Sequence, residues 1–392
     1  MLIMNENTEL YYKDAYLKEF DAVVTGCAEG KTGFEITLSK TAFYPEGGGQ
    51  PGDTGTLNGT AVTDTRRRND VIVHITEQPI AVGTPVHGII CWQRRFDLMQ
   101  QHSGEHIFSG IVHEFFGYDN IGFHLGEDTI TLDFSGPLTW EDLRRVEDKA
   151  NEIIWRNTEV EVSYPDEQHL HALAYRSKKE LEGTVRIVSI ADADVCACCG
   201  THVRSAGEIG LIKVLSCAAR KSGTRVEIVC GKRALCYCQT VCDENRRISH
   251  LLSAKVNETS AAVERMQKEL IDTTYKMRGI ILNELYSRLP EIEMDLPLYV
   301  YFAEGVDSKE LLKFANLVNE ERHARISAAF TKKDDHWHYV IISKSTDLRP
   351  LSRQLNEMFS GRGGGNRELI QGSLCGAEAE IKEALEQMCA GL

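Results

Sequence analysis

Two short motifs, about ninety residues apart, constrain the fold of this chain more than any other feature. The segment QQHSGEHIFSG carries His102 and His106, and the segment DVCACCGTHV carries Cys198 and His202. Helix positions four apart project from the same side, whereas the glycine and threonine between Cys198 and His202 favour a turn. Three imidazoles and one thiolate complete the tetrahedral ligand set of Zn²⁺. The motifs therefore predict a fold in which this helix and this turn meet at a metal site.

Alternatives to a catalytic metal site stay open. An isolated HxxxH is more often a pair of histidines on a polar helix face, and four protein ligands can also form a closed, purely structural site. Cys196 or Cys199 could supply the thiolate, although only Cys198 has the spacing to His202 that matches the first motif. The HExxH pattern of metalloproteases and the paired patterns of zinc deaminases are absent.

Composition narrows the class of protein. The chain has 392 residues, of which 42% are hydrophobic and 26% charged, as in an ordinary globular protein of two or three domains. Its start, MLIMNENTELYYKD, lacks the features of a secretory signal, and no apolar run is long enough to cross a bilayer. We therefore expect a cytoplasmic protein, without a membrane partner, whose twelve cysteines are reduced thiols or metal ligands. A net charge of −14 argues weakly against nucleic acid as a partner, but the basic residues are clustered.

Four regions follow from the patterns of apolar and turn-forming residues, and together they predict an α+β protein. Short β-rich runs in residues 1–92, broken by Gly, Pro, Asn and Asp, indicate a small antiparallel barrel. Residues 93–237 mix helical and strand patterns and indicate an α+β domain. Residues 238–288 contain no proline and predict a long helix or helical hairpin that links the domains. Residues 289–392 alternate strand and helix and indicate a compact α/β domain.

Two helix starts can be predicted from capping residues. Thr139 precedes a helical pattern and Asp142 stands three positions later, as in a capping box, while Asp307 precedes another helix with Glu310 at the same offset.

The long helical region carries an apolar stripe with an imperfect heptad spacing. This stripe is either the seam of a dimer or a surface that packs on the rest of the chain, and its spacing does not choose between them. The stripe comprises Leu252, Val256, Val263, Met266, Leu270, Met277 and Ile281.

Five segments, taken in order, resemble the editing region of alanyl-tRNA synthetase. They are FYPEGGGQPGDTG, QQHSGEHIFSG, GFHLGEDTITLDF, VRIVSIADADVCACCGTHV and GTRVEIVCGKRAL. The chain looks most like the free-standing alanyl-tRNA editing proteins called AlaX, in the long form. The glycine-rich GRGGGNRELIQGS is similar to a more weakly defined motif of the DHH-associated domain. The resemblance implies a zinc-dependent editing domain at 93–237 and a tRNA-binding or dimerisation domain of DHH-associated type at 289–392.

The resemblance also implies an activity, namely hydrolysis of tRNA(Ala) mischarged with serine, and secondarily with glycine. An activation site shaped for alanine cannot strongly reject these amino acids, so a second, hydrolytic site is required. The editing barrel begins near Met1, so we expect a stand-alone editor that does not aminoacylate tRNA. The alternative is a zinc-stabilised module that binds tRNA or protein without catalysis.

Candidate site residues are carried over motif by motif. His102, His106, Cys198 and His202 are the expected zinc ligands, and Cys199 stands where the family often has glycine. A homodimer through the long helix or the C-terminal domain is also expected. The expected substrate contacts are Gly48, Gly49, Gln50, Asp53, Phe123 and His124, with His124 a candidate for reading the serine hydroxyl. The expected tRNA contacts are Arg220, Lys221, Arg362 and Arg367.

Overall fold

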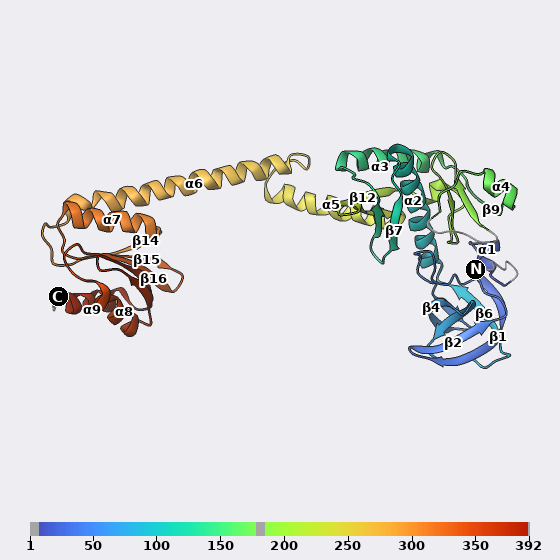
Figure 1. The fold of residues 1–392 in the computed structure, drawn as a ribbon, viewed down its shortest axis with the longest axis horizontal. Coiled ribbons are helices and arrows are strands. Elements are labelled where there is room, and N and C mark those ends of the chain that lie inside the picture. The colour runs from blue at the N-terminus through green and yellow to red at the C-terminus, as the bar shows by residue number, and fades with distance from the viewer. Residues whose placement is uncertain (1–7, 178–184, 391–392) are drawn as a thin grey trace. The chain divides into compact units, whose positions relative to one another are not determined.

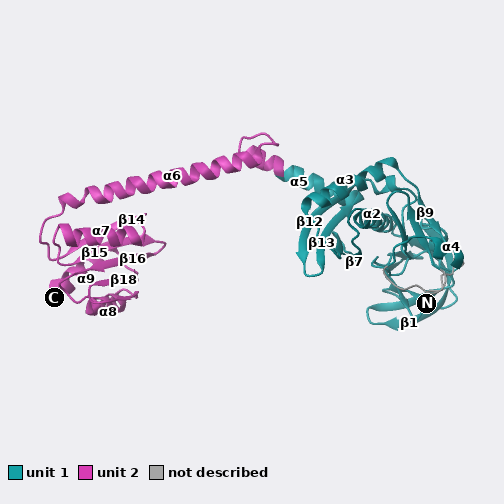
Figure 2. Ribbon diagram, turned by 45° about the horizontal axis from the view of Figure 1, so that its top comes forward, with its two compact units in different colours: residues 1–244 teal, residues 245–392 magenta. Residues whose placement is uncertain are grey.

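The computed structural model describes residues 8–177 and 185–390. The chain divides into two compact units, residues 1–244 and 245–392, and each unit is described by itself (Figure 2). The predicted mixture of helix and strand is confirmed, while the four predicted domain boundaries remain predictions. Among the described residues, none of the helices has the length and apolar character needed to span a membrane.

The first unit begins with a short helix, α1 (Leu10–Lys13), and a closed six-stranded barrel, which confirms the predicted barrel. The strand order is β1-β2-β5-β4-β3-β6 and every pair is antiparallel. Asn58 and Gly59 both have positive φ in the β3–β4 hairpin, as a two-residue turn requires. The strands are β1 (Glu19–Gly30), β2 (Gly33–Leu38), β3 (Gly55–Leu57), β4 (Thr60–Arg68), β5 (Val71–Thr76) and β6 (Pro85–Ile90).

The rest of the first unit surrounds one long helix, α2 (Trp92–Phe116), whose second half is buried almost all round. Helix α2 contacts two antiparallel sheets, one of order β12-β13-β8-β7 and a smaller one of order β11-β10-β9 (Figure 1). The remaining elements are β7 (Asn120–Leu125), β8 (Ile130–Phe134), α3 (Trp140–Arg156), β9 (Val160–Ser163), α4 (Glu167–Ala172), β10 (Ile187–Ile190), β11 (Asp194–Ala197), the 3₁₀ turn Ala206–Ile209, β12 (Ile212–Arg220) and β13 (Gly223–Cys230).

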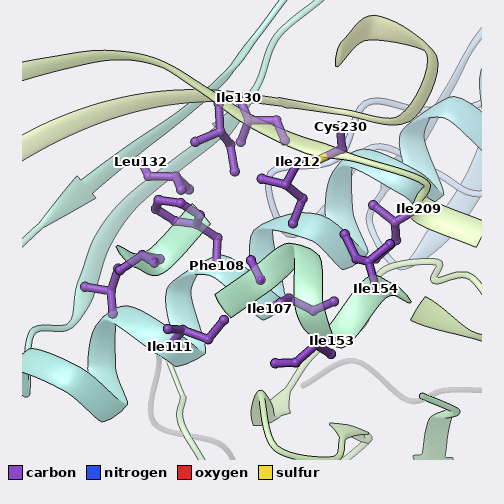
Figure 3. Packing of buried hydrophobic residues seen from close by; sticks show 14 of the residues in the cluster. Ile107, Phe108, Ile111, Ile130, Leu132, Ile153, Ile154, Ile209, Ile212 and Cys230 are labelled. Carbon is purple, nitrogen blue, oxygen red and sulfur yellow. The ribbon is translucent and has the colours of Figure 1, made fainter. Parts of the chain in front are cut away.

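Burial of apolar side chains fixes α2 in this position. Ile107 and Phe108 of α2 pack with Leu132 of β8 and with Ile153 and Ile154 of α3, and all five are almost inaccessible to solvent (Figure 3). Complete burial of side chains of this size stabilises by about 1.5–3 kcal/mol each. The histidines on the same helix are therefore held by a rigid element.

The predicted start of α3 is confirmed. The side chain of Thr139 accepts a hydrogen bond from the backbone N–H of Asp142, and the carboxylate of Asp142 accepts one from the backbone N–H of Thr139. This reciprocal pair satisfies two N–H groups that the first turn of a helix leaves without partners.

Helix α5 (Gly231–Leu251) leads into the second unit, in which the long helix α6 precedes a five-stranded sheet. The sheet order is β14-β15-β16-β18-β17, with β14 and β15 parallel and the other pairs antiparallel. Helices α6 and α7 contribute to one apolar core and α8 and α9 to another. Asp307 caps α7 as predicted. The elements are α6 (Thr259–Ser287), the 3₁₀ turn Leu289–Glu291, β14 (Tyr299–Glu304), α7 (Ser308–Glu321), β15 (Ser327–Lys333), β16 (His336–Ile342), α8 (Arg349–Met358), β17 (Arg362–Gly365), β18 (Leu369–Leu374) and α9 (Glu378–Ala390).

Candidate metal and substrate site

Four of the sequence-predicted residues come together in the first unit. His102 and His106 lie one turn apart on α2, while Cys198 and His202 lie in the turn that follows β11. Their ligand atoms all lie within 4.8 Å of one another. The Sγ atom of Cys198 is 3.5 Å from Nε2 of His102 and 3.4 Å from Nε2 of His202. The structure thus brings together the two motifs, ninety residues apart, around a single point.

Each histidine of this cluster also has a hydrogen-bond partner at Nδ1, its second ring nitrogen. Nδ1 of His102 lies 2.9 Å from Oε1 of Gln50, and Nδ1 of His106 lies 2.8 Å from a carboxylate oxygen of Asp194. Nδ1 of His202 lies 3.1 Å from the hydroxyl of Ser103. Amide and carboxylate oxygens accept a hydrogen bond from Nδ1–H, and this favours the tautomer that leaves Nε2 with a lone pair. Such outer partners are typical of histidines that bind a metal.

The charges within the cluster also match a metal site. Burial would raise the pKa of the Cys198 thiol, but the three neighbouring histidines hold it well below its usual value. The backbone N–H of Gly200 donates a hydrogen bond to the same sulfur, at 3.3 Å. Burial lowers the pKa of His202 to about 3. Burial would lower the pKa of His106, but Cys198 and Asp194 raise it above its usual value. A thiolate is the form of cysteine that binds Zn²⁺, and three imidazoles with one thiolate fit that ion.

Two glycines allow this close approach. A Cβ on Gly200 would lie 2.1 Å from Cε1 of His102, so the turn can approach the imidazole only without a side chain. A Cβ on Gly110 would lie 2.1 Å from the backbone oxygen of Ala193, which precedes Asp194 at the start of β11. The sequence indicated Gly200 only as part of a turn and gave no signal for Gly110, because both requirements come from a distant partner.

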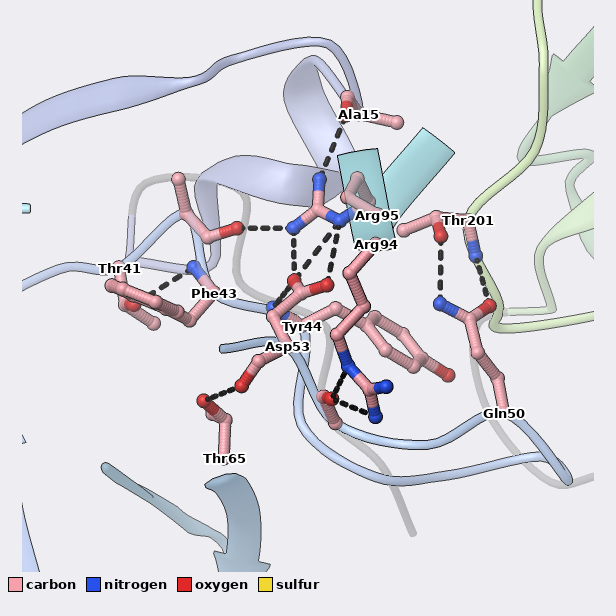
Figure 4. A network of polar contacts seen from close by, with 12 residues as sticks. Ala15, Thr41, Phe43, Tyr44, Gln50, Asp53, Thr65, Arg94, Arg95 and Thr201 are labelled. Atoms are coloured by element: carbon pink, nitrogen blue, oxygen red, sulfur yellow. Dashed lines mark hydrogen bonds and ion pairs between the residues drawn. The ribbon is translucent and has the colours of Figure 1, made fainter. Parts of the chain in front are cut away.

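Gln50 and Asp53 both have hydrogen-bond partners within the protein (Figure 4). The Gln50 amide also donates to the Thr201 hydroxyl at 2.8 Å and accepts from the Thr201 N–H at 3.2 Å. The carboxylate of Asp53 accepts from the Tyr44 N–H and from the buried guanidinium of Arg95. These contacts suit positioning roles for both, and their predicted contacts with substrate stay predictions.

The remaining predicted substrate residues divide into two groups. Gly48 and Gly49 are exposed, both have positive φ, and a Cβ on Gly49 would lie 2.4 Å from the ring of Phe123. Phe123 is half-buried with its ring centroid 5.4 Å from that of His102. His124 is exposed and, because neighbouring residues of a strand alternate, lies on the opposite face of β7. The structure therefore places Gly49 and Phe123 beside the cluster and His124 away from it.

Members of the cluster differ in exposure. His102, His106 and His202 are buried, whereas Cys198 is partly exposed. Cys199 is also partly exposed, and Gly48 and Gly49 are exposed.

The neighbouring cysteines have different environments from Cys198. Cys196 is buried in β11, where burial raises the pKa of its thiol to about 11, and it lies close to His106 and Asp194. Burial likewise raises the pKa of the Cys199 thiol. Both thiols are thus held in the neutral form that binds metal poorly, which favours Cys198 as the ligand.

Two arginines that were not predicted from the sequence support the site. Arg176 forms two hydrogen bonds with the carboxylate of Asp194, of 2.7 and 2.8 Å. Arg186 donates to the backbone oxygens of Cys198 and Gly200, which holds the turn that carries the thiolate. Neither residue has a local signature, because each partner is supplied by the tertiary fold.

The predicted tRNA contacts lie at exposed positions. Arg220 ends β12 and Lys221 follows it in the β12–β13 turn of the first unit. Arg362 begins the glycine-rich strand β17 and Arg367 lies in the turn that follows it, both in the second unit. Their side chains are available to a partner, and the proposed role of each stays a prediction.

Comparison with known proteins gives the following similarities. Residues 185–227 match the family described as the second additional domain of threonyl and alanyl tRNA synthetases, and residues 4–94 match class II (A) tRNA synthetases. The alanyl-tRNA editing protein AlaX-L of Pyrococcus horikoshii is 29% identical, over 97% of this chain and 98% of that protein. The alanyl-tRNA editing protein Aarsd1 of Danio rerio is 27% identical, over 95% of this chain and 94% of that protein. An alanine–tRNA ligase of Ignicoccus hospitalis is 29% identical over 98% of this chain, which spans 43% of the ligase.

Proposed function

The chain resembles alanyl-tRNA editing proteins over nearly all of its length, as its motifs predict, and from this premise we propose that it hydrolyses the ester of mischarged tRNA(Ala). Serine is the amino acid that we propose to be released from the tRNA, and glycine is the proposed second one. The observation that carries the proposal is the cluster itself. Ligand atoms of three histidines and one cysteine lie within 4.8 Å of one another, and Cys198 is the partly exposed member.

The proposed cofactor is Zn²⁺, held by His102, His106, Cys198 and His202. When bound, this ion would supply a Lewis acid for ester hydrolysis. Gln50 and Asp194 orient their histidines through Nδ1, and Ser103 does the same for His202. The chain thus holds the donor atoms in place before any substrate arrives, which limits the reorganisation needed during reaction.

The aminoacyl end is proposed to enter over Gly48, Gly49 and Phe123. Gly49 lies against Phe123, which lies beside His102, and the two exposed glycines present backbone without a side chain, which would let the terminal ribose and the ester approach closely. The half-buried ring of Phe123 offers an apolar wall beside His102.

The tRNA body is the proposed partner of the exposed basic residues. Arg220 and Lys221 in the first unit, and Arg362 and Arg367 in the second, would neutralise backbone phosphates, which dominate the affinity of most proteins for nucleic acids. A homodimer, formed through the long helix or the C-terminal region, is part of the same proposal.

Deacylation assays with three esters test the proposed activity. Purified protein is incubated with seryl-, glycyl- and alanyl-tRNA(Ala), with the Cys198→Ala variant as the matched control. We expect rapid loss of the seryl ester and slow loss of the alanyl ester, because only the serine hydroxyl can add a hydrogen bond in the site. Equal rates on all three esters would contradict editing. A zinc-loaded protein that hydrolyses none of them would indicate a non-catalytic, zinc-stabilised binding module.

A further inference from the structure

One arginine beside the metal cluster is buried without a counter-ion. Arg186, the residue that precedes β10, is only 5% exposed, and no carboxylate among the described residues forms an ion pair with it. Its Nη1 donates to the backbone oxygens of Cys198 and Gly200, at 2.8 and 3.0 Å. Its Nε is buried without a hydrogen-bond partner, and Nη2 bonds to none of the described residues. Because a buried charge is costly unless it is paired, this edge of the guanidinium is suited to a ligand.

Other largely buried arginines of the first unit are paired. None of four such side chains is more than 17% exposed, and each forms an ion pair with a carboxylate: Arg67 with Glu9, Arg95 with Asp53, Arg176 with Asp194 and Arg233 with Asp97. Arg176 shows the geometry, since its Nε and Nη2 donate to the two oxygens of one carboxylate, at 2.7 and 2.8 Å. This edge of a guanidinium is a fork that matches two oxygens of a carboxylate or a phosphate. Arg186 has the same fork and lacks the oxygens.

Arg186 and the glycine loop, residues 47–49, meet at the same turn. Arg186 donates to the backbone oxygen of Gly200, and a Cβ on Gly200 would lie 3.2 Å from Oε1 of Gln50, which directly follows the loop. The backbone N–H of Thr201 donates to the same oxygen, also at 3.2 Å. The turn that carries Cys198 therefore has the guanidinium on its backbone oxygens and the end of the glycine loop on its next two residues.

Two tyrosines and a thiol neighbour Arg186. Its guanidinium carbon lies 5.8 Å from the ring centroid of Tyr12, and the hydroxyl of Tyr44 donates to the backbone oxygen of Gly47 in the glycine loop, at 3.1 Å. Burial raises the pKa of Tyr12, Tyr44 and Cys199, and the charge of Arg186 opposes that rise at each of them. Tyr12 and Cys199 are partly exposed, so side chains that reach the surface lie next to this buried charge.

We propose that the fork of Arg186 binds an oxyanion of the substrate, namely the phosphodiester group on the 5′ oxygen of the aminoacylated adenosine. The proposal rests on the proposed function, which puts the ribose of this adenosine over the glycine loop. An aminoacyl ester has no free carboxylate, and an arginine would repel its ammonium group. The phosphate across the ribose is the anionic group nearest to the ester. The carboxylate of the released amino acid has the same oxyanion chemistry and is the alternative source, which the test separates from the phosphate.

Binding of analogues that cannot be hydrolysed tests the proposal. In 3′-deoxy-3′-(L-serylamino)adenosine an amide replaces the ester, and three forms are compared by calorimetry with the full-length protein. The first form carries a negatively charged methyl phosphodiester on the 5′ oxygen, the second a neutral methylphosphonate ester, and the third a free hydroxyl. The variants are Arg186→Gln and Arg186→Lys. Arg225→Gln is the matched control, because it removes the same charge while the fork of Arg225 is already occupied by Asp133, with two bonds of 2.7 Å.

The expected result is that the wild type binds the charged form about 10- to 100-fold more tightly than the two uncharged forms, the range of charge-assisted hydrogen bonds. Arg186→Gln removes this gain and changes the affinity for the uncharged forms by less than about threefold. Arg186→Lys keeps part of the gain, because it keeps the charge without the fork, and Arg225→Gln keeps all of it. The comparison of the three forms in the wild type needs no substitution, so it stays decisive whatever a substitution does to the turn.

Three results would overturn the proposal. Equal affinity of the wild type for the charged and neutral forms would remove the phosphate contact. An equal loss for all three forms in Arg186→Gln would show that Arg186 only holds the turn. Free L-serine that binds to the wild type but not to Arg186→Gln, with no gain from the phosphate, would assign the fork to the carboxylate of the released amino acid. Deacylation is measured separately, so these results leave the proposed hydrolysis standing, whereas a phosphate gain without hydrolysis would contradict only the proposed activity.

Discussion

Buried histidines occur in two parts of the first unit, and they are satisfied in different ways. His74 of the barrel has a partner for each ring nitrogen, since Nδ1 lies 2.9 Å from the backbone oxygen of Ile36 and Nε2 lies 2.8 Å from the hydroxyl of Thr41. His102, His106 and His202 have such a partner only at Nδ1, and their Nε2 atoms face a thiolate. The chain completes the first environment by itself, whereas the second has the donor atoms that a cation could bind.

The ion pair of Asp53 and Arg95 resembles His74, because it is also a buried polar group whose partners come from the chain itself. Arg95 is fully buried, and its guanidinium donates to Asp53 and to the backbone oxygens of Ala15 and Ala42. A buried charge of this kind persists because it is paired and hydrogen-bonded. Burial of a polar group therefore does not by itself mark a functional site. A functional site is indicated by buried ligand atoms that converge on one point without a partner from the chain.

The largest expected effect comes from removing the thiolate. Cys198→Ala is expected to lower zinc affinity by more than about a hundredfold and to abolish deacylation, because a direct ligand matters more than its outer partner. Metal content by mass spectrometry, measured beside the deacylation rate, checks this. Cys196→Ala is the control, and it should keep both zinc and activity. Zinc retained in Cys198→Ala but lost in Cys196→Ala would show that the site uses a different sulfur.

A second prediction concerns His74, whose pKa burial lowers to about 4 from 6.5. The folded protein keeps His74 neutral while the unfolded chain binds a proton below about pH 6.5. The contribution of neutral His74 to the free energy of unfolding is therefore complete above pH 6.5. It is lost as the pH falls towards 4, by up to about 3 kcal/mol.

Urea unfolding of the metal-free protein at pH 7 and pH 5 measures this effect, with His74→Asn as the comparison. The variant should lose less stability than the wild type between the two pH values. An equal loss in both proteins would mean that His74 titrates normally in the folded state.

A third prediction separates positioning from substrate contact at Gln50. Gln50→Leu removes the acceptor for His102 Nδ1, so zinc affinity should fall by about 10- to 100-fold. Competition with a zinc-binding dye measures the affinity. Gln100→Leu is a matched control on α2, because the amide of Gln100 binds the backbone oxygen of Glu208 instead of the cluster. If Gln50→Leu kept full zinc affinity and lost only turnover, Gln50 would be a substrate contact after all.

The smallest expected effect is at the proposed phosphate contacts, far in sequence from either kind of histidine. Arg362→Ala and Arg367→Ala should each reduce the salt dependence of tRNA binding by about one unit of slope and leave zinc content unchanged. Filter binding at several salt concentrations gives the slopes. Unchanged slopes in both variants would remove these arginines from the tRNA surface.

The sequence predicted those parts of the fold that depend on local patterns. Short strands broken by turn residues predicted the barrel, and the capping residues Thr139 and Asp307 marked helix starts correctly, because each of these signals lies within a few residues. The spacing of the two motifs also predicted which four side chains would meet. These features require no knowledge of distant contacts.

The outer partners of the site could not be predicted in this way. Gln50 binds Thr201 and His102, and Asp53 binds Arg95, and all three partners are far away in the sequence. The contacts of a polar side chain depend on what the fold places opposite it.

Reconstitution with zinc tests the central claim most directly. Metal-free protein is titrated with Zn²⁺ and the rate of seryl-tRNA(Ala) deacylation is measured after each addition. If the cluster of His102, His106, Cys198 and His202 is the metal site of a hydrolase, the metal-free protein is inactive and the rate rises linearly to a break at one equivalent of zinc per chain. Full activity in the metal-free protein, or zinc binding at one equivalent without any hydrolysis, would contradict the claim.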